Sequence, residues 1–237
     1  MTGKEKYCLR LSEIRFDKRK AVGILQIGIP SAFQYSLFAF ANLFVQSSVN
    51  SFDHVLVEGN SAAANADPLV YDMMAAFYTA CSSFIAQNFG ARKKKRILQT
   101  YLICLFYSFI TSLVLGVGIY LARYPFLYLF TSDKAVVEAG ITRLSIMALS
   151  YSASAFMDAS IAASRGLGKT AVPTFVVVMG SCVFRIIWIY TIFAYFHTIQ
   201  SLYILYVFSW GITAIAENIY FFHVYRHTLT GKTESHL

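Results

Sequence analysis

Residues 92–122 read RKKKRILQTYLICLFYSFITSLVLGVGIYLA, five basic residues followed directly by a long apolar stretch. The apolar part, residues 97–122, exceeds the roughly 20 residues that a helix needs to cross about 30 Å of hydrocarbon. The bilayer core offers the backbone no water to bond, so such a stretch is expected to be helical. The segment therefore predicts a transmembrane helix whose start is marked by positive charge.

Five further apolar stretches fill most of the 237-residue chain. Hydrophobic residues make up 57% of it, the mean hydropathy is +0.55 and only 14% of residues are charged, against about 25% in a soluble domain. We therefore predict an all-α integral membrane protein. Its six spans are expected at residues 22–49, 69–89, 97–122, 136–163, 172–196 and 202–224.

Lysine and arginine are divided unevenly between the two sides of these spans. Sixteen of the 20 lie before the first span, in residues 92–96, in the loop after the fourth span or in the tail. Arg123, Lys134 and Arg143 lie toward the other side. Because cytoplasmic loops carry the excess of Lys and Arg, both termini are expected in the cytoplasm. The net charge of +8 then indicates contact with anionic lipid rather than nucleic acid.

These assignments divide the chain into three parts. Residues 1–20 are expected to be a basic cytoplasmic linker, residues 21–226 a six-helix transmembrane lobe, and residues 227–237 a cytoplasmic tail. Residues 51–68, rich in Ser, Asn and Ala, are expected to form an outer loop. We expect a multi-pass protein of the cell membrane, either plasma or bacterial inner membrane.

Three ionisable residues, Asp158, Arg185 and Glu217, fall inside predicted spans, where charge is costly and often functional. The fifth and sixth spans should form a helical hairpin, so Arg185 and Glu217 are expected to meet as a buried ion pair. The pair either only ties two helices together or takes part in ion coupling. A carboxyl group away from water can exchange a proton near neutral pH. Asp158 is thus a candidate for protonation or cation contact, or an ordinary polar group near the helix end.

The first span carries four amides, at Gln34, Asn42, Gln46 and Asn50. The last three fall within about 80° of one another around a helix. Such a stripe should face protein or water, so it either lines a wet cavity or bonds to neighbouring helices. Pro30 is expected to kink this helix.

No pattern in the sequence indicates an enzyme or a metal site. The cysteines and histidines lack ligand spacing, and no catalytic constellation is present. Residues 166–170, GLGKT, resemble the end of a phosphate-binding loop, but that motif needs glycine where this chain has Ala163, and a preceding strand. We expect no cofactor.

Several motifs resemble those of the multidrug and toxic compound extrusion (MATE) transporters, and specifically their C-terminal lobe. These are Gly28-Ile29-Pro30 and residues 41–52 (ANLFVQSSVNSF) in the first span, residues 86–91 (AQNFGA) closing the second, and residues 165–170 (RGLGKT) followed by Pro173. Their order on six spans carries the resemblance, which extends over about residues 9–226.

The resemblance implies one lobe of a twelve-helix, two-lobe antiporter with a central cavity. Such transporters export organic, often cationic, compounds in exchange for H⁺ or Na⁺. The partner would be an N-terminal lobe or a second copy of this chain, and the amides and Tyr151 would line the cavity. The alternatives are half of a related lipid-linked oligosaccharide flippase and a non-transporting membrane scaffold or remnant.

The chain departs from the family pattern at two positions. Some members carry a glutamate where this chain has Phe38, and an aspartate where it has Ser154. Their cation site is therefore not carried over to this chain. Asp158 lies one helical turn beyond Ser154 and is the candidate substitute.

Overall fold

The computed structural model describes residues 16–230, with side chains to residue 227. Most of the expected linker (residues 1–15) and of the expected tail (residues 231–237) lies outside the described residues. Within the described range, six helices are long and apolar enough to cross a membrane, which confirms the prediction of six helical spans. They are Lys18–Val49, His54–Gly90, Lys94–Leu121, Lys134–Gly166, Ala171–Phe196 and Ile199–His227.

Some of these spans consist of several shorter elements. The elements are α1 (Lys18–Val49), α2 (His54–Ala64), α3 (Ala66–Gly90), α4 (Lys94–Leu121), α5 (Arg123–Tyr128), α6 (Lys134–Gly166), α7 (Ala171–Val177), the π-helical segment η2 (Val178–Val183), α8 (Phe184–Trp188), the π-helical segment η3 (Ile189–Phe193), α9 (Ala194–Phe196) and α10 (Ile199–Thr230).

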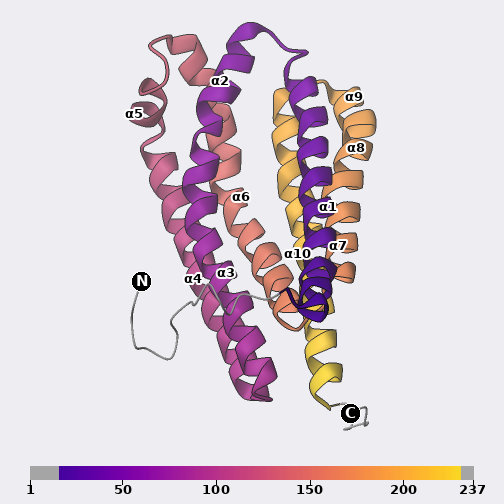
Figure 1. Ribbon diagram of the computed structural model, residues 1–237. Helices are drawn as coiled ribbons and strands as arrows, with labels where there is room; N and C mark the ends of the chain where they lie inside the picture. Colours follow the sequence, from indigo (N-terminus) through magenta and orange to yellow (C-terminus); the bar gives the residue numbers. More distant parts are fainter. Residues whose placement is uncertain (1–15, 231–237) are drawn as a thin grey trace.

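The helices form two groups on either side of α6 (Figure 1). The helices α3 and α4 lie on one side, and α1, α7 to α9 and α10 lie on the other. Helix α6 packs against α2, α3, α4 and α10. It is the central helix of the bundle, which explains why serine and alanine, small enough for close helix contact, fill its buried positions.

The prediction of an outer loop at residues 51–68 is wrong, because α2 and the start of α3 contain most of these residues. The Asp53 carboxylate accepts a hydrogen bond from the Leu56 backbone N–H at 2.9 Å and so caps α2. Gly59 lies so close to α6 that an added Cβ would stand 2.8 Å from the Val136 carbonyl oxygen. The small and polar residues that favoured a loop are a close-packing surface against α6.

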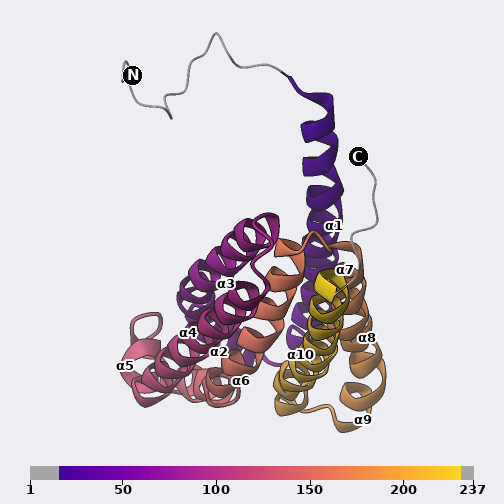
Figure 2. The ribbon, with the colours of Figure 1, turned by 90° about the horizontal axis from the view of Figure 1, so that it is seen from below.

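Helix α1 is bent. In Figure 2 its N-terminal part turns away from the bundle, whereas the remainder runs along it. Pro30 lies inside α1 and cannot donate a backbone hydrogen bond. Its role in the bend stays a prediction.

The fifth span changes its winding twice, through η2 and η3, and the short helix α8 between them carries Arg185. π-Helical turns often occur at functional sites, because the wider turn re-aims side chains. Gly180 of η2 allows a close approach to α10, since a Cβ there would stand 2.4 Å from Oγ1 of Thr213. This irregular winding decides where Arg185 points.

Candidate functional site

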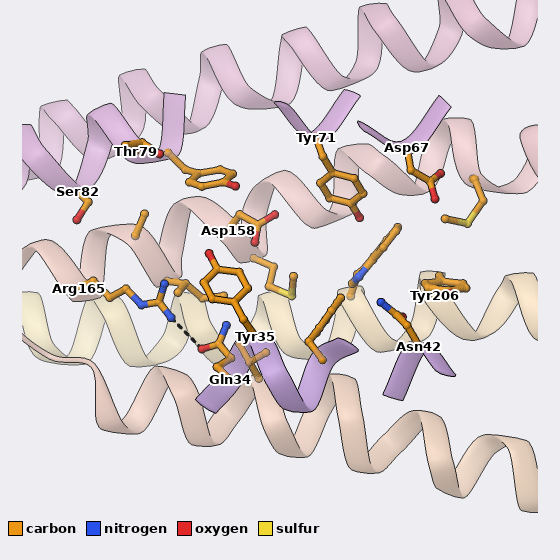
Figure 3. Close-up of a pocket in the computed structure, with 18 residues that line it drawn as sticks. Gln34, Tyr35, Asn42, Asp67, Tyr71, Thr79, Ser82, Asp158, Arg165 and Tyr206 are labelled. Atoms are coloured by element: carbon orange, nitrogen blue, oxygen red, sulfur yellow. Dashed lines mark hydrogen bonds between the residues drawn. The ribbon is translucent and has the colours of Figure 1, made fainter. Parts of the chain in front are cut away.

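A cavity of about 550 Å³ opens between the two groups of helices. Helices α1, α3, α6, α7 and α10 supply the residues that line it (Figure 3). Aromatic side chains supply much of the wall, namely Tyr35, Phe38, Tyr71, Tyr78, Tyr206 and Trp210. Such rings pack against apolar compounds and attract organic cations through their faces.

Three charged side chains line the cavity, and they follow one another along it. In Figure 3, Asp158 projects into the middle, between Arg165 toward one end and Asp67 toward the other. Asp67 is already paired with Arg143, with 2.6 Å between its Oδ2 and Nη2 of Arg143. Within the described residues that is the only ion pair between side chains. Asp158 is therefore the lining carboxylate that has no cationic partner at ion-pair distance.

Arg165 joins α6 to α1 at one end of the cavity. Its Nη2 donates a hydrogen bond to Oε1 of Gln34 at 2.9 Å (Figure 3). Its Nε is buried and has no hydrogen-bond partner among the described residues. Arg165 thus has donor capacity left for a further acceptor.

Glu217 of α10 is completely buried. Neither of its carboxyl oxygens has a hydrogen-bond partner among the described residues. An isolated carboxylate away from water is strongly disfavoured, so such a group takes up a proton or a cation, or gains a partner in another conformation. Helix α10 contributes Tyr206 and Trp210 to the cavity lining, but Glu217 is not among the lining residues.

The expected ion pair between Arg185 and Glu217 is not formed. Nη1 of Arg185 donates to Oδ1 of Asn42 at 2.7 Å, and Nε donates to the Ser209 hydroxyl at 3.3 Å. Ser209 and Glu217 both lie on α10, eight residues and therefore roughly 12 Å apart along the helix axis. Once Arg185 reaches Ser209, it lies too far along α10 to reach Glu217.

Two aromatic rings take the place of a counter-ion beside Arg185. Its guanidinium carbon lies 4.6 Å from the ring centre of Phe38 and 4.5 Å from that of Tyr206. Burial of the side chain is complete, and desolvated cation–π contacts contribute about 2 kcal/mol each. Phe38, Tyr206 and Asn42 also line the cavity, so Arg185 supports the cavity wall from behind.

The four amides of α1 divide into two pairs. Gln34 and Asn42 line the cavity, and each accepts a hydrogen bond from an arginine. Gln46 and Asn50 are exposed, and they bond to each other at 2.9 Å. Tyr151 is buried outside the cavity lining, where it donates a hydrogen bond to Asp67.

Asp67 and Arg143 are the residues that sequence reasoning missed, because both were assigned to the outer side of the membrane. Arg143 also donates to the Asn60 carbonyl oxygen at 2.9 Å. The signal available in the sequence was Arg143 itself, which lies nine residues inside the long helix that begins at Lys134. A cation at that depth needs a partner.

Comparison with known proteins identifies the fold. The MatE family model matches residues 30–191 of this chain. The chain belongs to the MatE family. This confirms the resemblance seen in the sequence motifs. No curated protein matches.

Solved structures of MATE transporters show the same arrangement of helices. A MOP superfamily transporter from Pyrococcus furiosus, described as having a binding pocket of reverse polarity, superposes with a TM-score of 0.84 at 19% identity, over 94% of this chain and 50% of that one. An outward-facing multidrug resistance MATE transporter gives 0.83 at 19% identity, over 93% and 50%. A mutant of a Vibrio cholerae MATE transporter gives 0.78 at 18% identity, over 92% and 50%.

The chain spans about half the length of each of these structures. At this level of identity the similarity establishes the fold.

Proposed function

We propose that this MatE chain forms one lobe of a secondary active antiporter that exports organic cations in exchange for H⁺ or Na⁺. The observation that carries the proposal is the aromatic-walled cavity with Asp158 at its middle, where no cation of the described residues lies at ion-pair distance from it. An organic cation is stabilised there by ring faces and by one carboxylate. The chain is proposed to be multi-pass in the cell membrane, with both termini in the cytoplasm.

Competition for one carboxylate explains how the two fluxes are coupled. A proton or Na⁺ on Asp158 cancels the charge that holds the organic cation, so the two ligands exclude each other. As one lobe rocks against the other, the site is exposed to each side of the membrane in turn, once with the organic cation bound and once with H⁺ or Na⁺ bound. Arg165 lies at one end of the same cavity, and it can exchange Gln34 for a carboxylate when the lobe moves.

The complementary half is an N-terminal lobe or a second copy of this chain. Alternating access needs two bodies that move around one site, and the cavity lies along the seam between two helix groups (Figure 1). The membrane lipid surrounds the remaining apolar surface.

A half of a lipid-linked oligosaccharide flippase is the second transport candidate. A ligand with a diphosphate linkage requires cationic lining, and among the described residues the cavity has one lining cation, Arg165, beside two carboxylates. This favours an organic cation over an anionic lipid-linked substrate. A non-transporting scaffold is the remaining alternative, and a binding measurement separates it from both.

The test is binding of a fluorescent organic cation, such as ethidium, to the purified chain in nanodiscs, followed by uptake into proteoliposomes under a pH or Na⁺ gradient. The variant is Asp158→Asn. The matched control is Asp72→Asn, which removes an exposed carboxylate of α3 that does not line the cavity. We expect Asp158→Asn to weaken binding by about tenfold, the loss of one ion contact, and Asp72→Asn to leave it unchanged.

Transport is measured for the chain alone and together with a second lobe. Transport by either preparation that depends on the gradient and on Asp158 supports the proposal. Tight binding that is insensitive to Asp158→Asn contradicts the role of Asp158. Absence of dye binding contradicts the organic-cation proposal and leaves the scaffold interpretation.

A further inference from the structure

A second cavity, of about 490 Å³, lies on the outer surface between α3 and α4, beside the turn that joins them. Helices α3 and α4 lie side by side along this face (Figure 1). The cavity is separate from the one that contains Asp158, with which it shares no lining residue. The site proposed below does not depend on transport.

The groove changes from cationic to apolar along the helices. Lys93 and Arg96 line it at the turn, and Phe84 and Ile103 line it farther into the span. Phe84 lies six residues before the end of α3 and Ile103 nine residues after the start of α4, or roughly 9 Å and 14 Å from the helix ends. Both are 55% exposed. The apolar part therefore lies at the depth of lipid acyl chains, and the cations lie at the depth of headgroups.

Polar amides complete the headgroup end of the groove. Gln87 and Asn88 line it from α3, and Gln99 lines it from α4. The Lys93 backbone N–H donates to the Asn88 carbonyl oxygen at 2.9 Å, and Arg92 adopts a left-handed φ of 54°. This closed turn places Lys93 beside Arg96. No carboxylate is among the residues that line the groove.

The five cations of residues 92–96 are not equivalent. Four of them are exposed, and of these Lys93 and Arg96 line the groove whereas Arg92 and Lys95 do not. Lys94 is directed elsewhere, with its Nζ 5.4 Å from the ring centre of Tyr225. A cluster that served only to hold the loop on one side of the membrane would need no such division, since that effect counts charges and not their positions.

We propose that this groove is a binding site for an anionic phospholipid. The phosphate lies between Lys93 and Arg96, the amides bond to the rest of the headgroup, and one acyl chain runs along Phe84 and Ile103. Basic pockets between transmembrane helices bind anionic headgroups in this manner. Arginine suits a phosphate because its planar fork donates two parallel hydrogen bonds.

The chain offers a matched pair of variants for the test. Lys93→Gln with Arg96→Gln removes the two groove cations, and Arg92→Gln with Lys95→Gln removes two cations of the same loop that lie outside the groove. The two double variants have the same net charge. Binding of a fluorescent phosphatidylglycerol to the full chain in detergent micelles is measured by anisotropy, with fluorescent phosphatidylcholine as the uncharged counterpart.

We expect the groove variant to bind phosphatidylglycerol about thirtyfold more weakly, as for the loss of two basic headgroup contacts, and the control variant to bind within about twofold of the parent. Equal losses in both variants would overturn the site in favour of diffuse charge attraction. Equal affinity of the parent chain for the two lipids would overturn it as well.

A second arm separates a lipid from a free anion. Inorganic phosphate at millimolar concentration is expected not to displace the labelled lipid, because it lacks the acyl chain that contacts Phe84 and Ile103. Phe84→Ala with Ile103→Ala should then weaken lipid binding while both cations remain. Displacement by phosphate alone, or unchanged binding by the alanine variant, would contradict a lipid ligand.

Discussion

Arg143 of α6 forms an ion pair with Asp67 at the start of α3, with 2.6 Å between Nη2 and Oδ2. The same arginine donates to the carbonyl oxygen of Asn60 in α2, and Tyr151 donates to Asp67. The Arg143 side chain is 8% exposed and that of Asp67 is 29% exposed. One charged cluster therefore joins α2, α3 and α6 at the end of the cavity where Asp67 lies.

Replacing either member of this pair should destabilise the lobe. Breaking a buried ion pair by removing one partner costs about 3–5 kcal/mol, and the partial exposure of Asp67 reduces this to about 2–3 kcal/mol. Arg143→Ala and Asp67→Asn together should cost less than the sum of the single changes, with a coupling of about 1–2 kcal/mol. Unfolding of the purified chain in bicelles by SDS measures these free energies.

Arg123→Ala is the control for that cycle. Arg123 is only partly exposed at the same end of the bundle, where its guanidinium lies over the rings of Tyr120 and Tyr124. Its removal should cost no more than about 1 kcal/mol, the contribution of exposed cation–π contacts. Strict additivity of Arg143→Ala and Asp67→Asn would show that the pair contributes nothing.

A second double-mutant cycle distinguishes the two partners considered for Arg185. Because Arg185 bonds to Asn42 and not to Glu217, Arg185→Ala and Asn42→Ala should couple by about 1–2 kcal/mol. Arg185→Ala and Glu217→Gln should be additive. Both cycles are measured by the same unfolding assay. Coupling to Glu217 without coupling to Asn42 would favour the ion pair first expected from the hairpin.

Glu217→Gln should leave stability unchanged or raise it by about 1 kcal/mol. The carboxyl group is fully buried without a hydrogen-bond partner among the described residues, and an unpaired charge is the costly form. The amide is never charged, whereas the carboxyl group is charged only after it loses its proton.

Glu58→Gln serves as the control, because Glu58 is exposed on α2. It should change stability by less than about 0.5 kcal/mol in the same SDS unfolding assay. A large loss of stability in Glu217→Gln would mean that the ionised carboxylate has a partner and is held as a structural charge.

The sequence predicts the helices well because their length and hydrophobicity are set by the bilayer. Residues 97–122, for example, were expected to span, and α4 covers Lys94–Leu121. The prediction from sequence fails at residues 51–68, because Gly59 and its small neighbours are equally typical of a loop and of a close helix contact. The side on which the termini lie stays a prediction from charge alone.

Individual residues of the site are less predictable than the spans. Asp158, Gln34 and Asn42 could be selected because polar groups in a span need polar surroundings. Their partners could not be, because a partner depends on rotation and height between helices. The π-helical segments η2 and η3, on either side of α8, change both the rotation and the height of Arg185. Hydrophobic periodicity in the sequence does not reveal such segments.

The contact between α4 and α6 provides the sharpest test of the packing. A Cβ on Gly116 would lie 2.1 Å from the carbonyl oxygen of Ala148, a backbone atom that cannot move without displacing α6. Gly118, two residues along the same helix, has nothing within 4 Å of such a Cβ. Gly116→Ala should therefore destabilise the lobe by about 1–3 kcal/mol or more through overpacking.

Gly118→Ala should be neutral or stabilising by up to about 1 kcal/mol, because alanine restricts the unfolded chain and favours the helix. Both variants are compared in the SDS unfolding assay, and dye binding reports whether the cavity survives. If α6 is displaced by Gly116→Ala, Asp158 on the same helix moves with it, so dye affinity should fall in this variant alone. Equal behaviour of the two alanine variants would show that α4 and α6 do not approach each other as closely as the structure has them.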